Sequence, residues 1–562
     1  MSELFTYGQG EAPWRNADAD PGELMEGRAL ETGRRRIVVA AAVLIAAYAA
    51  VSIRLAGLAV SEPQTSTRIA RAEVPEQARA DIVDRHGRLL AADMTGYILA
   101  ADTWRVVDRQ ETAHKIAAVL GLDAGDLARR LSTRTGTVWL ERELTPRQRY
   151  AVHNLGLAGI RFIEERRRVY PQGPVLSHVL GFADVDGRGR AGVERSLNDR
   201  LTARADGEPV ALSIDMRFQH ALRDELLRTM ERFKASGAAG LVLDVRSGEI
   251  LALASLPDFD PNRPAAALEP GRINRATMGT YEFGSTLKAF TVAMALDSGA
   301  VSLDTEYNVS EPIRRGRFRI RDYHRHGEPM TVTEIFRHSS NIGTTKITLD
   351  AGLETQQTYL RRFGLLERPR LELPEVSAPI LPRRWNELEA MTISYGHGLA
   401  LNMVQLASGA AALVNGGCRV EPTLIRGGGE NRGCARVITE RTSRTMRALL
   451  RDVVKNGTGR RAQVEGYPIG GKTGSAEKAR RGGYDRRALL SSFLGVFPAH
   501  NPRYLLIVAV DEPTPGADTS WHVTGGITAA PAVARVVSRI GPIVAYAPGE
   551  GGESGPVIVA SN

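Results

Sequence analysis

The feature that most constrains this 562-residue chain is an uncharged apolar run over residues 37–53, directly after three arginines at positions 34–36. At about 1.5 Å per residue, a helix over this run is about 26 Å long, slightly shorter than a hydrocarbon core of about 30 Å. If the Arg54 side chain reaches the interface, the apolar residues that follow it lengthen the span. We therefore expect a single transmembrane anchor over residues 37–58.

The arginines before this run also predict the orientation of the chain. Because positively charged residues are retained on the cytoplasmic side, we expect residues 1–36 to form a cytoplasmic tail and the chain from about residue 60 to lie outside the cytoplasm. A cleavable signal peptide, with Gly57 and Ala59 as the small residues of its cleavage site, is the alternative. Either interpretation exports the remainder of the chain.

Charge and composition exclude other classes of protein. The 73 Lys and Arg residues outnumber the 64 Asp and Glu residues, for a net charge of +9. The basic residues are scattered, however, and no zinc-finger, helix-turn-helix or RNA-binding signature accompanies them, so we predict no nucleic-acid binding. Hydrophobic residues make up 43% and charged residues 24%, which is the mix of an ordinary globular protein.

The exported chain divides into two units. Residues 60–208 alternate short apolar runs with arginine-rich loops, whereas residues 209–542 have the pattern of a larger α/β (α+β) unit with hairpin-joined, antiparallel strands. Residues 543–562 are rich in Gly, Pro and Glu and are expected to be disordered. The elements expected in the larger unit are a strand over 210–215, a helix over 219–233, a hairpin of strands over 241–244 and 250–254, helices over about 285–415, strands over 470–476, 489–497 and 504–511, and a helix over 527–540.

Ser285 and Lys288 are the first candidate catalytic pair. They follow Gly284 at the start of an apolar helical segment. A spacing of three puts both side chains on one helical face, and the helix N-terminus favours negative charge that develops at the serine. A serine hydroxyl becomes a good nucleophile only when a base takes its proton, and a desolvated neutral lysine can be that base. The four-residue pattern is too common to identify a function alone.

Two further motifs add polar groups. Ser339-Ser-Asn341 offers a hydroxyl that can relay a proton and an amide that can bind a second amide, although a helix cap explains the same residues. Gly471-Lys-Thr-Gly-Ser475 lies on an expected strand. There Lys472 provides a cation, Thr473 and Ser475 provide hydroxyls, and Gly474 allows a ligand to approach the backbone.

Lysine is rare in this chain, which makes each lysine informative. Only seven of the 73 basic residues are lysines, namely Lys115, Lys234, Lys288, Lys346, Lys455, Lys472 and Lys478. If lysine and arginine were interchangeable, lysine at both motif positions would have a probability of about 1%. Arginine does not deprotonate in proteins, so a base position gives a chemical reason for lysine.

In this order, the three motifs resemble those of the penicilloyl-serine transferases, which comprise the penicillin-binding proteins and the serine β-lactamases. The resemblance extends over residues 35–540. Segments that resemble the non-catalytic pedestal module of that family lie at 79–87, where Ala80 replaces the usual glycine, at 167–171 and at 178–194. Segments that resemble the surroundings of its active-site sheet lie at 400–417 and 525–531.

The overall organisation resembles one class within this family. One anchor, a pedestal over residues 60–208, a transpeptidase domain over residues 209–542 and no recognisable glycosyltransferase module are typical of class B, the monofunctional enzymes. His178-Val-Leu-Gly181 and the modest length are more similar to the division type (FtsI-like) than to the elongation type. The elongation type stays open as the alternative.

The resemblance implies a serine-type peptidoglycan D,D-transpeptidase that cross-links stem peptides during septal cell-wall synthesis. Ser285 would attack the carbonyl of the penultimate D-Ala and expel the terminal D-Ala, with Lys288 as the base. Ser339 would pass the proton to the leaving amine, and Asn341 would hold the substrate amide.

Two further roles follow from the same resemblance. Lys472, Thr473 and Ser475 would bind the terminal carboxylate, and serine stands at position 475 where the family usually has threonine. The backbone N–H groups of Ser285 and Ser475 would form the oxyanion hole. No cofactor or metal is implied.

The implied setting is the bacterial inner membrane, with the catalytic domain periplasmic. Lipid-linked precursor strands would be the substrates, β-lactams the inhibitors, and an FtsW-type glycosyltransferase and other divisome membrane proteins the partners. Two other classes stay open. A β-lactam-sensing receptor would need a cytoplasmic signalling module, for which residues 1–36 are too few, and a non-catalytic scaffold would have degraded motifs.

Other polar clusters have structural explanations. Asp322, His324 and His326 would align on one face of a strand, but no fourth metal ligand is visible and we expect no metal there. His338 and His397 lie near the motifs, where a supporting polar role is more common than that of a general base.

Only two cysteines are present, which is too few for a disulfide scaffold or a cysteine-rich zinc site. Cys418 and Cys434 are 16 positions apart, with Gly427-Gly-Gly429 between them as a turn. A hairpin could bring them together and an oxidising compartment would close the bond, so we hypothesise a disulfide, with two free thiols as the alternative.

Overall fold

The computed structural model describes residues 39–52, 79–132, 136–203, 207–316, 318–325, 327–429, 433–480, 483–515 and 522–544. Residues 39–52 are helical. Among the residues described, no helix combines the length and the apolar character that crossing a membrane requires. The cytoplasmic tail predicted over residues 1–36, the ends of the predicted anchor and the predicted tail from residue 545 onward lie outside the described residues.

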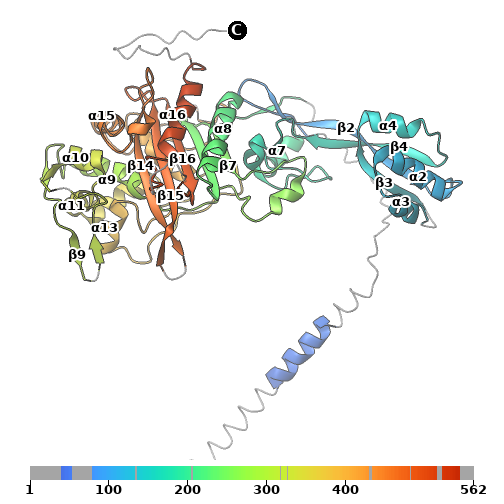
Figure 1. The fold of residues 1–562 in the computed structure, drawn as a ribbon, viewed down its shortest axis with the longest axis horizontal. Coiled ribbons are helices and arrows are strands. Elements are labelled where there is room, and N and C mark those ends of the chain that lie inside the picture. Colours follow the sequence, from blue (N-terminus) through green and yellow to red (C-terminus); the bar gives the residue numbers. More distant parts are fainter. Residues whose placement is uncertain are drawn as a thin grey trace, which may run out of the picture.

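The N-terminal unit is built around a small mixed sheet with the strand order β3-β2-β1-β5, in which β4 also pairs with β2 (Figure 1). Its long strand β2 is antiparallel to β3 and β4, and its helices bury Ile116 and Leu131 against Leu99 of β2. Its elements are β1 (Ile82–Val83), β2 (Leu89–Asp102), α2 (Arg109–Leu120), α3 (Ala124–Leu131), β3 (Thr137–Leu144), α4 (Pro146–His153), β4 (Ile160–Val169) and β5 (Val210–Ala211).

A buried ion cluster joins three distant segments of this unit. Glu194, which is fully buried, accepts from Arg79 Nη2 at 2.7 Å and from Arg168 Nε at 2.7 Å. Removal of one partner from such a cluster leaves an uncompensated buried charge, which is strongly destabilising. The cluster therefore explains why Arg79 and Glu194 stand in the pedestal segments that the sequence resembles.

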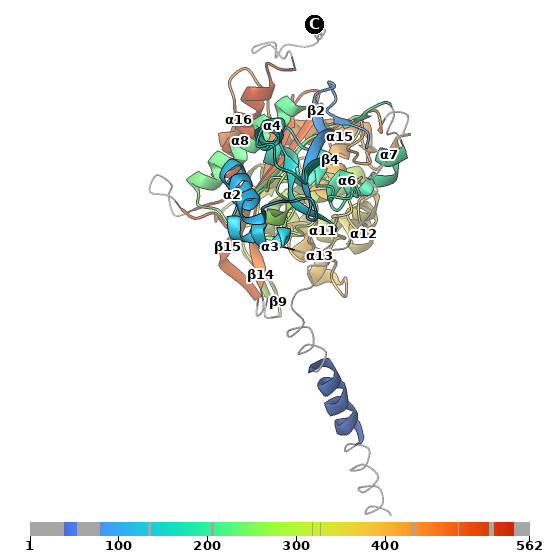
Figure 2. The same ribbon diagram turned by 90° about the vertical axis from the view of Figure 1, so that its right-hand side faces the viewer.

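The C-terminal unit is organised by a five-stranded antiparallel sheet with the order β14-β15-β16-β6-β7. Every residue of the central strand β16 is buried, and its alternate side chains face opposite layers. Leu506 and Val508 pack with helices α8 and α16, whereas Leu505 and Ile507 pack with the helical layer on the other face (Figures 1 and 2). The strands are β6 (Gly237–Asp244), β7 (Ile250–Leu256), β14 (Gly470–Arg480), β15 (Gly483–Phe497) and β16 (Tyr504–Asp511).

Helices cover both faces of this sheet (Figures 1 and 2). Strand β14 is an edge strand, paired within the sheet only to β15 and packed against α15. The principal helices are α8 (Met216–Arg232), α9 (Lys288–Asp297), α10 (Val332–His338), α11 (Asn341–Ala351), α12 (Leu353–Arg362), α13 (Glu387–Ser394), α14 (Met403–Ala412), α15 (Glu440–Asn456) and α16 (Ala529–Ile540).

Most of the expected elements are present, but the strand predicted over 210–215 is wrong beyond its first two residues. Only Val210 and Ala211 pair as a strand, parallel to β1. Asp215 instead caps helix α8, because its side chain accepts from the backbone N–H of Arg217. The helix therefore starts at Met216, earlier than its apolar periodicity indicated.

Candidate active site

Ser285 lies at the N-terminus of a helix, as predicted. The 3₁₀ turn Gly284–Leu287 runs directly into α9, and Gly284 has a φ of +52° that favours glycine. A Cβ atom on Gly284 would lie 2.4 Å from the carbonyl oxygen of Ser475, so the turn is packed directly against strand β14. Ser285 itself is half-buried. The geometry holds the serine beside the strand that carries the third motif.

Lys288 brings the first two motifs together. Its ammonium group is fully buried and contacts three atoms: the carbonyl oxygen of Ser339 at 2.5 Å, Ser339 Oγ at 3.1 Å and Asn341 Oδ1 at 2.7 Å. No hydrogen bond joins Lys288 to Ser285 among the described residues. Hydrogen bonds of this kind often tighten only when substrate is bound.

Lys472 completes the cluster from strand β14. Its Nζ donates to Ser339 Oγ at 2.9 Å, so one hydroxyl lies between two fully buried lysines. Burial lowers the pKa of Lys472 to about 7. Burial and the nearby Lys472 charge lower the pKa of Lys288 well below its ordinary value, and Asp322 opposes this shift. Of the two lysines, Lys288 is therefore the one whose pKa is lowered both by burial and by the charge of the other.

Ser339 has an unusual backbone conformation. It ends helix α10 with φ 63° and ψ 43°, and its N–H donates to the carbonyl oxygen of Ile335. This left-handed conformation costs a non-glycine residue about 1–2 kcal/mol. The turn points the Ser339 carbonyl and hydroxyl at Lys288, so the strained residue is the one that joins the two lysines.

Asp322 is a site residue that sequence reasoning misassigned. Its carboxylate accepts from Ser340 Oγ at 2.6 Å and from the backbone N–H groups of Asn341 and Ile342, and so it caps α11. It does not belong to a strand, so the predicted alignment of Asp322 with two histidines is wrong, and His326 lies outside the described residues. The carboxylate stabilises the second motif, and only the fold reveals this contact.

The third motif lies on β14 as expected. Thr473 Oγ1 is 2.8 Å from Thr458 Oγ1, and Ser475 Oγ accepts from the N–H of Gly525 at 3.0 Å, which leaves the Ser475 hydroxyl hydrogen available to a ligand. A Cβ atom on Gly474 would lie within 2.4–2.5 Å of Phe283, Ser492 and Thr286. Packing of the strand against the turn that carries Ser285 therefore explains this glycine.

The same segment also matches the spacing of a phosphate-binding loop, with glycines at 466 and 471 before Lys472 and Thr473. In such a loop the lysine follows a strand and opens a helix. Here Gly470–Arg480 is an edge strand of an antiparallel sheet, and Lys472 is fully buried beside Ser339. The fold therefore excludes phosphate cradling by this segment.

Three residues before Ser285 lies a half-buried carboxyl group. Glu282 accepts from the N–H of Gly398 at 2.8 Å and from the hydroxyl of Tyr484 at 3.0 Å, and burial raises the pKa of its carboxyl group. His397 packs edge-on against Tyr484. Burial and the charge of Lys288 lower the pKa of His397 to about 4, so its imidazole is neutral near pH 7 and is a poor proton acceptor.

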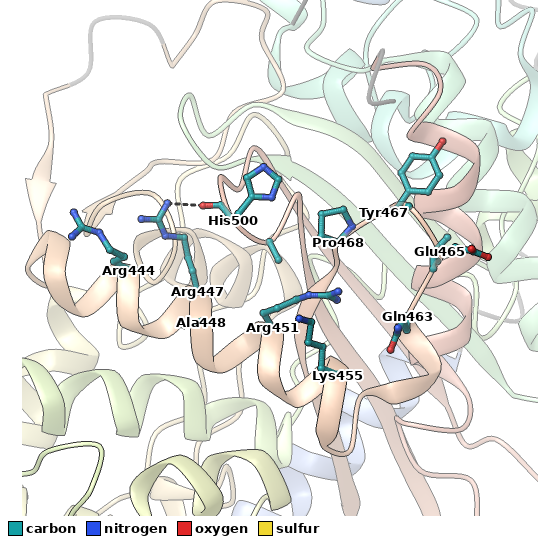
Figure 3. A pocket seen from close by; sticks show the side chains of 13 residues that line it. Arg444, Arg447, Ala448, Arg451, Lys455, Gln463, Glu465, Tyr467, Pro468 and His500 are labelled. Carbon is teal, nitrogen blue, oxygen red and sulfur yellow. Dashed lines mark hydrogen bonds between the residues drawn. The ribbon is translucent and has the colours of Figure 1, made fainter. Parts of the chain in front are cut away.

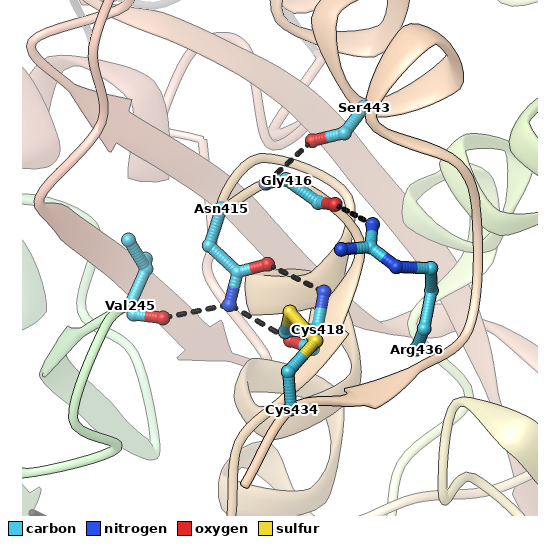
Figure 4. The surroundings of a disulfide bond; sticks show 7 residues. All are labelled: Val245, Asn415, Gly416, Cys418, Cys434, Arg436 and Ser443. Carbon is cyan, nitrogen blue, oxygen red and sulfur yellow. Dashed lines mark hydrogen bonds between the residues drawn. A yellow bond between two sulfur atoms is a disulfide. The ribbon is translucent and has the colours of Figure 1, made fainter.

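Cys418 and Cys434 are joined by a disulfide away from this cluster, with their Cα atoms 5.1 Å apart (Figure 4). Cys418 begins a short antiparallel pairing with residues 435–436, which brings the two sulfur atoms together. Asn415 supports the turn, because its side-chain amide donates to the carbonyl oxygens of Cys418 and Val245, both at 2.8 Å.

Comparison with known proteins follows the division of the chain into two units. Residues 238–537 match the penicillin-binding protein transpeptidase domain, and residues 75–217 match the penicillin-binding protein dimerisation domain. A probable peptidoglycan D,D-transpeptidase FtsI of Caulobacter vibrioides is 39% identical over 484 residues, which cover 84% of this chain and 82% of that protein. The peptidoglycan D,D-transpeptidase FtsI of Escherichia coli is 29% identical over 533 residues, covering 87% of this chain and 88% of that protein.

A solved structure has the same fold. Penicillin Binding Protein 2X from Streptococcus thermophilus superimposes with a TM-score of 0.69 at 22% identity, covering 83% of this chain and 79% of that one. The family match spans more than half of this chain, and the identity to an FtsI extends over most of both sequences. The chain thus belongs to the penicillin-binding protein transpeptidases, as a class B member of the FtsI type.

Proposed function

We propose that this peptidoglycan D,D-transpeptidase uses Ser285 as its nucleophile and Lys288 as the base that activates it. The observation that carries the proposal is the position of Ser339 Oγ between Lys288 at 3.1 Å and Lys472 at 2.9 Å. Two buried ammonium groups this close repel each other, which favours loss of the proton from one of them. Lys288 begins α9 directly after the 3₁₀ turn that carries Ser285, so its neutral amine would be the proton acceptor nearest in sequence to the attacking hydroxyl.

The reaction divides into two acyl transfers. Ser285 Oγ forms a bond to the carbonyl carbon of the penultimate D-Ala while its proton passes to Lys288. The C–N bond to the terminal D-Ala then breaks, and the proton reaches the leaving amine through Ser339. An amine of a neighbouring strand next attacks the ester carbonyl, its proton passes through Lys288 to Ser285 Oγ, and the C–Oγ bond breaks to release Ser285. The product is a peptide cross-link between the two strands.

Binding groups for the substrate lie around these reacting atoms. We assign the terminal carboxylate to Lys472, Thr473 and Ser475, which lie on one edge strand. Asn341 would hold the substrate amide, with its own amide fixed by donation to the carbonyl oxygen of Arg321 at 2.9 Å. The backbone N–H groups of Ser285 and Ser475 would stabilise the oxyanion, which the close packing of these two segments supports.

We also propose the cellular setting. The uncharged run over residues 37–53 and the arginines before it support a single inner-membrane anchor, with residues 1–36 in the cytoplasm and the enzyme outside it. We place a pedestal over 60–208 and a transpeptidase domain over 209–542, and the matches of residues 75–217 and 238–537 to two separate domain families support a division into two such units. Septal synthesis with an FtsW-type glycosyltransferase and other divisome membrane proteins is the role we infer from the FtsI type.

Labelling with a fluorescent penicillin tests the nucleophile. The label should map by mass spectrometry to the peptide that contains Ser285, and Ser285→Ala should abolish labelling. Ser302→Ala, at an exposed serine in the loop after α9, is the matched control and should label normally. Label on Ser339 or Ser340 would refute the assignment.

Protease added to cells with a permeabilised outer envelope should digest the chain after residue 60 and spare residues 1–36.

A further inference from the structure

A basic groove runs along helix α15, outside the cluster of Ser285, Ser339 and the two lysines. It has a volume of about 860 Å³ and lies between α15 and the two loops at residues 463–468 and 499–500. Figure 3 shows the helix on one side and Tyr467, Pro468 and His500 on the other. None of these groups has a role in the acyl-transfer chemistry described above.

Four cations line the groove at helical spacing. Arg444, Arg447, Arg451 and Lys455 lie along the side of α15 that faces the groove (Figure 3). From the first to the last they span about 16 Å at 1.5 Å per residue. A single carboxylate, Glu465, is among the groove residues. The four positive charges therefore form a row. Such a row suits a ligand with several separated anionic groups better than it suits one small anion.

Two cations of this row, Arg447 and Lys455, have no ion-pair partner among the described residues, whereas Arg444 pairs with Glu440 at 3.2 Å and Arg451 donates to the carbonyl oxygen of Ile469 at 2.8 Å. Arg447 Nε is buried without a hydrogen-bond acceptor, and its Nη1 donates only to the neutral carbonyl oxygen of His500 at 3.3 Å. Burial and the neighbouring Arg444 lower the pKa of the Arg447 guanidinium, and the Glu440 carboxylate opposes this shift. Lys455 forms no ion pair with any residue the structure describes. A buried guanidinium N–H without an acceptor is a group that an anionic ligand can satisfy.

The groove leads toward the catalytic strand. Lys455 lies one residue before the end of α15, and three residues later Thr458 contacts Thr473 at 2.8 Å. The loop on the other side of the groove runs into β14 at Gly470, two residues before Lys472. A strand held in the groove would therefore be tethered next to the residues we assign to carboxylate binding.

We propose that this groove is a second, non-catalytic binding site for uncross-linked peptidoglycan, whose stem peptides end in carboxylates. The inference rests on the proposed function, because that function supplies the ligand. Each stem peptide of a glycan strand ends in a carboxylate, so one strand offers a row of anions to the row of cations. Holding the strand here raises the effective concentration of its other stems at Ser285 without any contact to the reacting atoms.

The test measures strand binding with the catalytic serine blocked. The full-length chain is first acylated with benzylpenicillin, and the binding of a soluble, uncross-linked glycan strand with free stem-peptide carboxyl termini is followed by fluorescence anisotropy. We expect binding to persist in the acylated wild type. It should weaken at least tenfold in the double variant Arg447→Gln/Arg451→Gln, and also when the strand carries amidated termini or the salt concentration is raised.

Arg361→Gln/Arg362→Gln, at two exposed arginines at the end of α12, is the matched control and should change binding less than twofold. Penicillin acylation rates should be equal in the wild type and both double variants, which separates failure of the groove from failure of the catalytic assignment. No binding by the acylated wild type, or equal binding by the groove variant, overturns the proposal. Preference for an acidic protein segment over the glycan strand also overturns it.

Discussion

Replacing Lys472 by arginine should remove an alkaline loss of acylation that we expect in the wild-type chain. We assign the substrate carboxylate to the ammonium group of Lys472, and burial lowers the pKa of that group to about 7. Above this pH the ammonium loses its proton and the attraction disappears. Arginine stays charged at every accessible pH and can still pair with a carboxylate.

The size of the loss follows from the fraction of Lys472 that is charged. With a pKa of about 7, half of the ammonium is charged at pH 7 and about 1% at pH 9, which is roughly a fifty-fold fall. The sign is fixed, because deprotonation of Lys288 increases the amount of base as pH rises and cannot cause a fall. In the Lys472→Arg variant the rate constant should rise with pH to a plateau and stay there.

The assay is the second-order rate constant for acylation by a fluorescent penicillin from pH 6 to pH 9.5, which reports ionisations of the free enzyme. Short reaction times limit alkaline hydrolysis of the reagent, and melting curves at each pH verify that both chains are folded. A wild-type rate constant that stays flat or rises to pH 9 would contradict the charge we assign to Lys472. A fall in the rate constant of the Lys472→Arg variant above pH 7, like that expected in the wild type, would contradict the same assignment.

The remaining predictions concern neighbouring groups. Lys288→Arg keeps the cation but cannot accept a proton, so penicillin acylation should fall by about 10²–10⁴, and a near wild-type rate would place the base elsewhere. Ser339→Gly should be more stable than Ser339→Ala by about 1 kcal/mol in urea unfolding, because glycine adopts the left-handed conformation without strain, whereas both should lose acylation. Asp322→Ala removes a negative charge that raises the pKa of Lys288, so the acid limb of the pH profile of acylation should move to lower pH, and an unchanged limb would exclude the interaction. Loss of the α11 cap should also lower the free energy of unfolding by about 1–3 kcal/mol. Cys418→Ser with Cys434→Ser opens a closed loop of 16 positions and should lower the free energy of unfolding by about 3 kcal/mol, and a chain that loses nothing would show that the disulfide is dispensable.

The three motifs could be located from sequence because each is a short local pattern. Ser285 and Lys288 are three residues apart on one helix, and the third motif occupies a single strand. The contact between the three motifs in space could not be located in this way. Ser339 reaches Lys472 across 133 positions, and no spacing rule predicts that one hydroxyl contacts both lysines.

The support of the site was beyond sequence reasoning for the same reason. Asp322 lies in a loop, and its contacts with Ser340, Asn341 and Ile342 depend on where that loop folds back. Alternation with His324 and His326 predicted that the three side chains share one strand face, and such local alternation carries no information about tertiary contacts.

The basic groove shows another limit of reading a sequence by composition. Arginines are scattered along the whole chain, so the four cations of α15 do not stand out by their number. Only the orientation of the helix distinguishes them, because it turns one side toward the loops and buries Leu450 and Val453 on another.

The position of β14 at the edge of its sheet has a consequence for which peptides the enzyme accepts. On its side away from β15, the strand pairs with no other strand that the structure describes, so the ladder ends there and an added strand could extend it. A stem peptide that lies along β14 would be bound mainly through its main chain, and main-chain hydrogen bonds are indifferent to side-chain identity. We therefore expect discrimination to be concentrated at the terminal carboxylate and the D-configured residues beside it, and variation at more distant stem positions to be tolerated.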